Sequence, residues 1–184
     1  MSRYLDRVLV IDVESTCWEG APPRGQISEI IEIGLCLVDT ERLQRLEKRA
    51  ILVRPQVSEV SDFCTRLTTI TAEMLVGAMS LEQSLDLLRN EYQSEDRLFV
   101  SWGDYDRNQF HRNCDYFRLK YPFGPTHLNV KTLFAIGESL PREVGIDAAC
   151  DILGRPLEGT HHRGVDDAWN IAGIYCELLE RLRK

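Results

Sequence analysis

An apolar run that ends in two acids constrains the fold of this chain most. Residues 7–14 read RVLVIDVE, and this series of β-branched and apolar residues predicts a strand in the interior of a sheet. Side chains alternate along a strand, so Asp12 and Glu14 project from the same face. Two carboxylates on a buried face repel each other and are costly to desolvate, which favours a divalent metal ion between them. The alternative is a strand that ends at Val13 and leaves both acids in water.

A helix is predicted over residues 164–183, where apolar residues recur every three or four positions. Its register separates two neighbouring aspartates. Asp167 lies on the inward side, whereas Asp166 lies on the polar face and can favour the helix N-terminus through the helix dipole. His162 precedes this helix, within reach of a metal that Asp167 holds, and is a candidate general base. The alternative for His162 is a structural or solvent-facing role.

A third acidic motif, SWGDYDRNQF at residues 101–110, follows a short apolar strand and begins another helix. Asp106 shares an inward stripe with Phe110, whereas Asp104 falls on the polar side of the helix. We therefore predict that Asp106 faces the sheet. We predict that Asp104 is the N-cap, whose carboxylate accepts the free backbone N–H groups of the first turn.

The ordered set of these motifs resembles the three exonuclease motifs of the DEDDh 3′-to-5′ exonuclease superfamily. Within this superfamily, the motif sequences most resemble those of the enhancer-of-RNAi and histone-mRNA 3′ exonucleases and their bacterial relatives. The resemblance covers about residues 7–180. The matching segments are VIDVESTCW (10–18), EIIEIG (29–34), SDFCTRLTTIT (61–71), SWGDYD (101–106) and HHRGVDDAWNIA (161–172).

The resemblance implies a ribonuclease H-like fold and hydrolysis of phosphodiesters. Two divalent ions, Mg²⁺ or Mn²⁺, would be held by the four acids Asp12, Glu14, Asp106 and Asp167, and such ions activate a water and stabilise the attacking and leaving oxygens. Oxygen ligands suit these hard cations better than zinc. His162 would take the proton from the water. Nucleoside 5′-monophosphates would leave one at a time from a single-stranded 3′ end, and the subgroup favours RNA over DNA.

The segment RLTTITAEM adds candidates for substrate binding. In the family, the matching leucine packs on the terminal base and the threonine lies near the sugar, which implies Leu67 and Thr68. Trp18 is a further candidate because tryptophans near such sites can stack on bases. Structural alternatives are core packing for Leu67 and an N-cap role for Thr71. The family usually has glycine where this chain has Thr69.

The chain predicts a single exonuclease domain over residues 1–184, without an added nucleic-acid-binding domain. The fold class is α/β, with a mixed sheet of about five strands, the first three antiparallel, and helices on both faces. A polar turn is expected at residues 39–42. Strands are expected at 7–14, 30–39, 49–53, 97–102 and 128–130, and helices within 58–93 and at 105–120, 131–138, 145–153 and 164–183.

Composition restricts the partners of the chain. It has 22 basic and 29 acidic residues, a net charge of −7, which works against a long binding track for phosphates. Four of the acids are assigned to metal binding, so we expect the protein to contact a nucleic acid locally, at one end of the nucleic-acid strand. No apolar run approaches the ~18 residues of a membrane span. Six cysteines without CxxC spacing indicate reduced thiols, and we expect a cytoplasmic protein with no membrane partner.

Two other functional interpretations remain open. The first keeps the chemistry and changes the substrate, to very short oligonucleotides as in an oligoribonuclease or to the 3′ ends of DNA. The acidic charge favours small substrates. The second is a catalytically idle fold that binds a partner as a regulator. The five motif positions all carry chemically competent residues, which argues against that interpretation.

Overall fold

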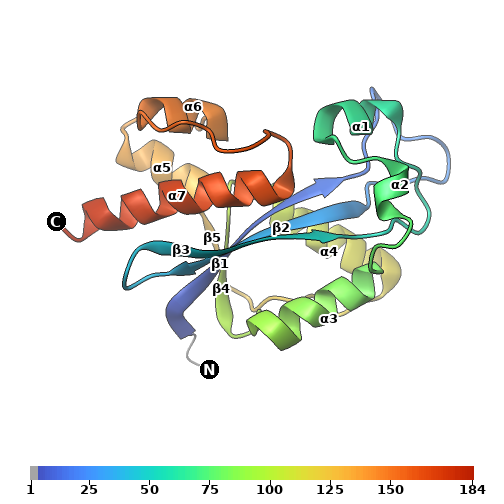
Figure 1. Cartoon of the computed structure of the whole chain (residues 1–184), viewed down its shortest axis with the longest axis horizontal. Helices are drawn as coiled ribbons and strands as arrows, with labels where there is room; N and C mark the ends of the chain where they lie inside the picture. The colour runs from blue at the N-terminus through green and yellow to red at the C-terminus, as the bar shows by residue number, and fades with distance from the viewer. Residues whose placement is uncertain (1–3) are drawn as a thin grey trace.

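A computed structural model describes residues 4–184 of the chain (Figure 1). Its five-stranded sheet has the order β3-β2-β1-β4-β5. Pairing is antiparallel between β1 and β2 and between β2 and β3, and parallel between β1 and β4 and between β4 and β5. The predicted mixed sheet with its first three strands antiparallel is therefore confirmed. The strands are β1 (Tyr4–Ser15), β2 (Ile30–Asp39), β3 (Gln44–Leu52), β4 (Arg97–Ser101) and β5 (His127–Asn129).

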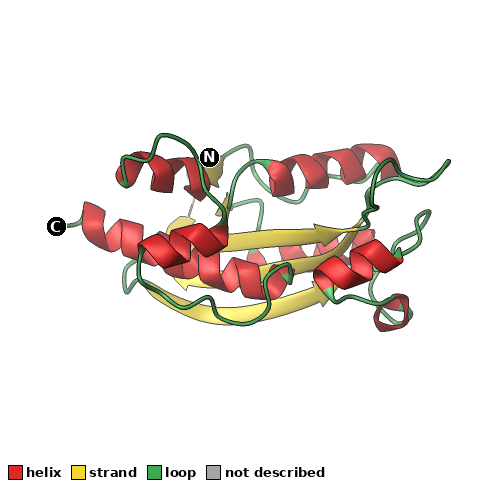
Figure 2. Ribbon diagram, turned by 90° about the horizontal axis from the view of Figure 1, so that it is seen from above, coloured by secondary structure: helices red, strands yellow, loops and turns green. Residues whose placement is uncertain are grey.

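Helices cover both faces of the sheet (Figures 1 and 2). The long helix α7 crosses one face together with α5 and α6, whereas α3 and α4 lie on the other face. The short helices α1 and α2 lie beyond the ends of β1 and β2 (Figure 1). The helices are α1 (Asp62–Thr68), α2 (Ala72–Leu75), α3 (Leu81–Tyr92), α4 (Tyr105–Phe117), α5 (Val130–Gly137), α6 (Ile146–Ile152) and α7 (Gly164–Leu182).

The alternation along β1 divides the core into two layers. Leu9 and Ile11 are fully buried in the cluster that includes residues of α3 and α4. Val8 and Val10 are buried in the opposite cluster, which includes residues of α5, α6 and α7. The two acids at the end of the strand continue the second series, because side chains on one face recur every two residues. They therefore lie on the face that α7 covers.

Side-chain caps mark the starts of α2 and α3, and the cap of α2 is the one expected from the sequence. Thr71 is the N-cap of α2, and its hydroxyl accepts a hydrogen bond from the backbone N–H of Met74 at 3.4 Å. Ser80 and Gln83 form a capping box at α3. The turn between α1 and α2 contains Thr69 with φ of 62°. That left-handed conformation is the one for which the family's glycine is suited.

Several expected boundaries were wrong. β1 begins at Tyr4 rather than at 7, and α4 ends at Phe117 rather than at 120. The third strand begins at Gln44, whereas a start at 49 was expected. Charged residues alternate along this exposed edge strand and hide the apolar pattern from which a strand is predicted. The turn before it spans residues 40–43 instead of 39–42. Within residues 4–184, no helix is both long enough and apolar enough to cross a bilayer.

Candidate active site

Three carboxylates meet where the N-terminus of α7 approaches the sheet. Asp12 pairs with Gly34 of β2 in the antiparallel register. A Cβ atom at Gly34 would lie 1.9 Å from the carbonyl carbon of Gly164, so only glycine allows this backbone contact. The contact brings Asp167 to β1. Carboxylate oxygens of Asp12, Glu14 and Asp167 then lie within 4.8 Å of one another, a spacing that can hold a metal ion.

Asp106 reaches the same place from the other face of the sheet. It is 3% exposed, and its Oδ1 accepts a hydrogen bond from the backbone N–H of Val13 at 2.9 Å. Its inward orientation agrees with the predicted register of α4. The prediction for Asp104 is half right, because the residue occupies the N-cap position but its carboxylate makes no capping hydrogen bond. Instead, an oxygen of Asp104 lies 3.4 Å from the side-chain nitrogen of Asn129.

Burial opposes ionisation of all four acids. It raises the pKa of Glu14 to about 9, and neighbouring carboxylates add to the shift. Burial raises the pKa of Asp106 to about 7, although backbone hydrogen bonds lower it. The pKa values of Asp12 and Asp167 are also raised, chiefly by burial. Four clustered carboxyl groups that resist ionisation together fit a divalent cation, which would compensate their charge with oxygen ligands alone.

Two histidines precede α7. The backbone N–H of His162 donates to Oδ2 of Asp167 at 2.9 Å, and His162 has φ of 62°. Its ring stacks on that of His161, with centroids 4.0 Å apart. Burial and the neighbouring His161 lower the pKa of His162, so the imidazole is neutral near pH 7 and able to accept a proton. His161 Nδ1 lies 3.1 Å from Oδ1 of Asp167.

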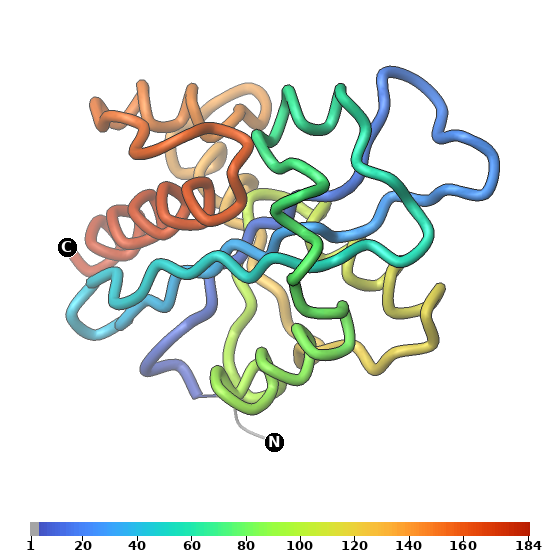
Figure 3. The backbone as a smooth tube through the Cα atoms, turned by 45° about the vertical axis from the view of Figure 1, so that its right-hand side comes forward, coloured from blue at the N-terminus to red at the C-terminus, as the bar shows by residue number. Residues whose placement is uncertain are grey.

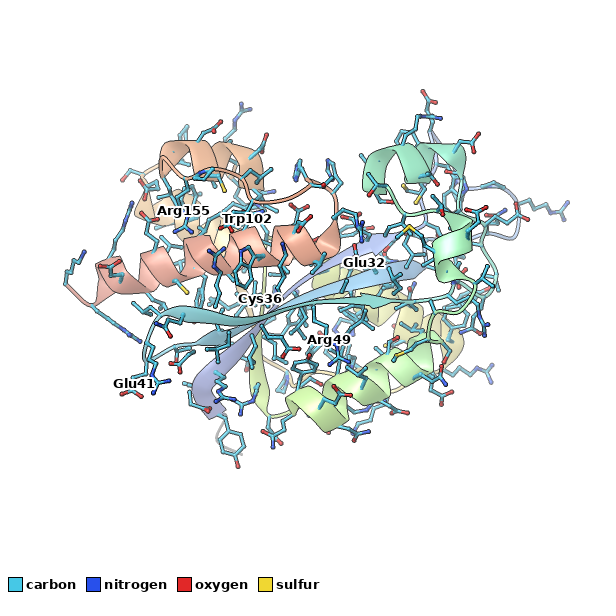
Figure 4. All side chains as sticks on the ribbon, viewed as in Figure 1. Glu32, Cys36, Glu41, Arg49, Trp102 and Arg155 are labelled. Carbon is cyan, nitrogen blue, oxygen red and sulfur yellow. The ribbon has the colours of Figure 1, made fainter. Side chains whose placement is uncertain are left out.

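No role was predicted for His161, although the sequence shows two adjacent histidines at 161 and 162. Glu32 was not predicted as a site residue either; this acid is the third residue of the apolar strand β2 and is fully buried. Glu32 binds the Arg163 side chain through both carboxylate oxygens and accepts the backbone N–H of Gly164. Figure 4 shows Glu32 beside the N-terminal turn of α7. These contacts fix the segment that carries both histidines.

Asp166 lies in the first turn of α7, where the predicted dipole role places it, and it also holds this segment. Its Oδ2 accepts the backbone N–H of Thr160 at 2.8 Å, and its Oδ1 lies 2.5 Å from Nζ of Lys48 on β3. Figure 3 shows the segment before α7 beside α1, where Arg163 Nη1 lies 3.4 Å from Oγ1 of Thr69. The segment is therefore connected to the sheet, to α7 and to α1.

The four acids and both histidines line one cavity of about 390 Å³. Leu67 from α1 lines it too and is 37% exposed, as a residue that packs on a ligand requires. Thr68 and Trp18 are not among the described lining residues. Thr68 is buried, and its hydroxyl donates to the carbonyl of Cys64 and accepts the N–H of Ile70. The other described lining residues are Val13, Ser15, Cys17, Trp102, Tyr105, Gly145 and Ile146.

A mixed sheet with four carboxylates at the end of its central strand defines a ribonuclease H-like nuclease. The chain belongs to the exonuclease family, whose family model matches residues 9–175. It is 31% identical over 190 residues to human 3′-5′ exoribonuclease 1, with 96% of this chain and 53% of the relative covered. The chain thus spans about half the length of that relative. It is also 26% identical to the 3′-5′ exonuclease Snipper of Drosophila melanogaster, covering 94% of this chain and 69% of Snipper.

Solved structures agree with this assignment. The nuclease domain of 3′hExo, a DEDDh family member bound to rAMP, superposes with a TM-score of 0.89 and 29% identity, covering 98% of this chain and 95% of that domain. A 3′-exonuclease structure described as showing 3′-end specific recognition of the histone mRNA stem-loop gives a TM-score of 0.86 and 29% identity, covering 98% and 65% of the two chains. The resemblance to the DEDDh superfamily and to this subgroup is therefore confirmed.

Proposed function

We propose that this chain is a metal-dependent 3′-to-5′ exonuclease that releases nucleoside 5′-monophosphates from single-stranded 3′ ends. The observation that carries the proposal is the meeting of Asp12, Glu14, Asp106 and Asp167 with His162 around one cavity. These residues come from β1, α4, α7 and the segment before α7, so only the folded chain assembles them. RNA is favoured over DNA because human 3′-5′ exoribonuclease 1 is named for RNA and the similar nuclease domain of 3′hExo was solved bound to rAMP.

The four carboxylates would hold two divalent ions, Mg²⁺ or Mn²⁺, because the donor set offers only hard oxygen atoms. Such ions would activate the attacking water and stabilise charge on the attacking and leaving oxygens. His162 lies at the exposed mouth of the cavity and is neutral near pH 7, so it would accept the proton of the water. The hydrogen bond from its backbone N–H to Asp167 holds the residue next to the carboxylates.

The cavity would accept the terminal nucleotide. Its volume of about 390 Å³ lies within the range of small-ligand sites. Leu67 offers an apolar surface on one side, and Tyr105, which is 52% exposed at the rim, offers an aromatic ring. Apolar and aromatic groups bind bases through their faces without reading sequence. This arrangement supports removal of the end nucleotide from many sequences.

The test is cleavage of matched 5′-labelled single-stranded RNA and DNA oligonucleotides with Mg²⁺ or Mn²⁺. A ladder that shortens from the 3′ end is expected, with faster shortening of RNA. Asp12→Ala and a chelator should each abolish it. Faster shortening of DNA would favour 3′ DNA trimming, and cleavage of very short oligonucleotides only would favour an oligoribonuclease. No cleavage of any substrate by a folded protein would overturn the proposal and favour the regulatory interpretation.

A further inference from the structure

A straight stripe of aromatic and cationic side chains leads away from the cavity along α4. Tyr105, Gln109, Arg112 and Tyr116 follow one another at intervals of four, three and four residues, which places them on one side of a helix. Tyr105 lines the cavity and is 52% exposed, and Tyr116 is 53% exposed. Tyr105, Arg112 and Tyr116 are therefore open to solvent, and the stripe begins at the cavity.

Arg112 is held in place within this stripe. Its guanidinium carbon lies 5.6 Å from the centre of the Tyr105 ring, and its Nε donates to Oε1 of Gln109 at 3.1 Å. Gln109 is fully buried and donates in turn to the carbonyl of Ser28 at 2.8 Å. Arg112 Nη2 also contacts Gln109. A guanidinium has five N–H donors, so an arginine fixed by two of them can still bind a phosphate.

The charge of this surface contrasts with that of the whole chain. The chain carries a net charge of −7, yet the four stripe positions of α4 include one cation and no acid. The neighbouring acid Asp115 is displaced around the helix by about 60° from Arg112 and by about 100° from Tyr116. A positive group between two exposed aromatic rings is the combination that binds single-stranded nucleic acid, through base stacking and phosphate contact.

We propose that this stripe extends the substrate path out of the cavity, with Arg112 and Tyr116 binding the nucleotides immediately upstream of the scissile bond. Tyr105 lies at the rim where the path begins, and the buried Gln109 positions Arg112. Tyr116 stacks on a base and Arg112 binds a phosphate. The inference rests on the proposed exonuclease function and extends it to a defined path for the substrate. Tyr105 and Tyr116 are separated by about 16 Å along the helix axis, which corresponds to roughly four to five stacked nucleotides. Substrates shorter than this cannot use the whole stripe.

The test compares hydrolysis of a 5′-phosphorylated dinucleotide with hydrolysis of a long single-stranded RNA. Tyr116→Ala should raise KM about tenfold for the long RNA, since one lost stack of about 1.4 kcal/mol corresponds to that factor. Arg112→Gln should also raise KM for the long RNA. It should reduce the slope of log(kcat/KM) against log salt by about 0.7, the value for one lost phosphate contact with a single strand. Dinucleotide kinetics should change less than twofold in both variants.

The matched control is Arg118→Gln. This residue is exposed at the C-cap that follows α4, and its replacement changes the net charge by the same amount as Arg112→Gln. It should alter neither KM nor the salt slope. Equal effects of Arg112→Gln and Arg118→Gln, or equal effects on the dinucleotide and the long RNA, would overturn the stripe while leaving the exonuclease assignment intact. Absence of hydrolysis of both substrates by the parent protein would overturn both proposals.

Discussion

Glu32 and Arg163 form a buried ion pair that links β2 to the segment before α7. Arg163 Nη2 lies 3.0 Å from Oε1 of Glu32, and Arg163 Nε lies 3.2 Å from Oε2. The Glu32 side chain has no exposed surface and that of Arg163 is 21% exposed. Because His162 and Asp167 flank this contact, the pair determines where the proposed base and one metal ligand lie relative to β1.

Glu32→Gln should therefore lower both stability and turnover. It removes one partner of a buried pair and leaves the charge of Arg163 without compensation, which costs about 3 kcal/mol. Chemical denaturation measures the first effect, and kcat on labelled RNA measures the second. The control is Glu91→Gln, which removes an exposed partner of Arg49 and should cost less than about 1 kcal/mol. Equal stability losses in the two variants would contradict the role given to Glu32.

His162→Ala should reduce kcat by about 10²- to 10⁴-fold, the usual contribution of a general base. Metal binding, measured by calorimetry with Mn²⁺, should stay nearly unchanged because the base is not a ligand. His161→Ala should have the smaller effect on kcat. The opposite order, with His161→Ala as the inactive variant, would transfer the role to His161, whose ring nitrogen lies 3.1 Å from Asp167.

Asp106→Asn and Asp104→Asn separate the two acids of the central motif. Asp106 is buried among the proposed ligands, so its replacement should abolish metal-dependent cleavage. Asp104 makes no capping hydrogen bond and is 53% exposed, so Asp104→Asn should change stability by no more than about 0.5 kcal/mol. Cleavage assays and thermal melts of both variants provide the measurement. Retained cleavage by Asp106→Asn would remove it from the proposed metal site.

Metal-free protein should lose stability as the pH rises. The folded-state pKa values of the clustered acids exceed those in the unfolded chain, so their contribution is fully present below about pH 4. It is lost as the pH passes the folded values, about 7 for Asp106 and about 9 for Glu14. Melting temperatures measured across this window with a chelator should fall.

Added Mg²⁺ should restore stability most at the alkaline end of that window, because the ion replaces protons on the carboxylates. The control is Glu14→Gln, which removes the group with a pKa of about 9 and should flatten the metal-free curve at that end. A metal-free melting temperature that rises with pH over the same range would contradict the electrostatic description of the site.

Thr69→Gly should stabilise the protein by about 1 kcal/mol, since a residue with a Cβ pays that order of energy at positive φ. Thr69 is exposed at the C-cap of α1 with φ of 62°. Arg66→Gly in the same helix is the control and should destabilise, because glycine weakens a helix interior. Denaturant midpoints of the two variants should move in opposite directions. A loss of stability for Thr69→Gly would show that its contact with Arg163 outweighs the backbone strain.

Local periodicity predicted much of the candidate site. Alternation along β1 placed Asp12 and Glu14 on one face, and the helical repeat selected Asp167 over Asp166 and Asp106 over Asp104 as the inward residue. The structure confirms these orientations, because Asp12 and Glu14 lie together beside Asp167, and Asp106 and Asp167 are buried. Each orientation follows from a repeat of two or 3.6 residues, which a short stretch of sequence contains in full. The predicted capping hydrogen bond of Asp104 was wrong, because such a bond depends on the side-chain rotamer and on nearby partners.

The sequence by itself determined which residues face inward and, through its ordered motifs, which family the chain belongs to. Only the tertiary structure decided how the segments meet. The contact of Gly34 with Gly164, the pair of Glu32 and Arg163, and the internal hydrogen bonds of Thr68 depend on it. Glu32 and Arg163 are 131 residues apart, and no local repeat spans that separation. These two residues meet because α7 packs on β2, and the burial of apolar surface on both elements drives that packing.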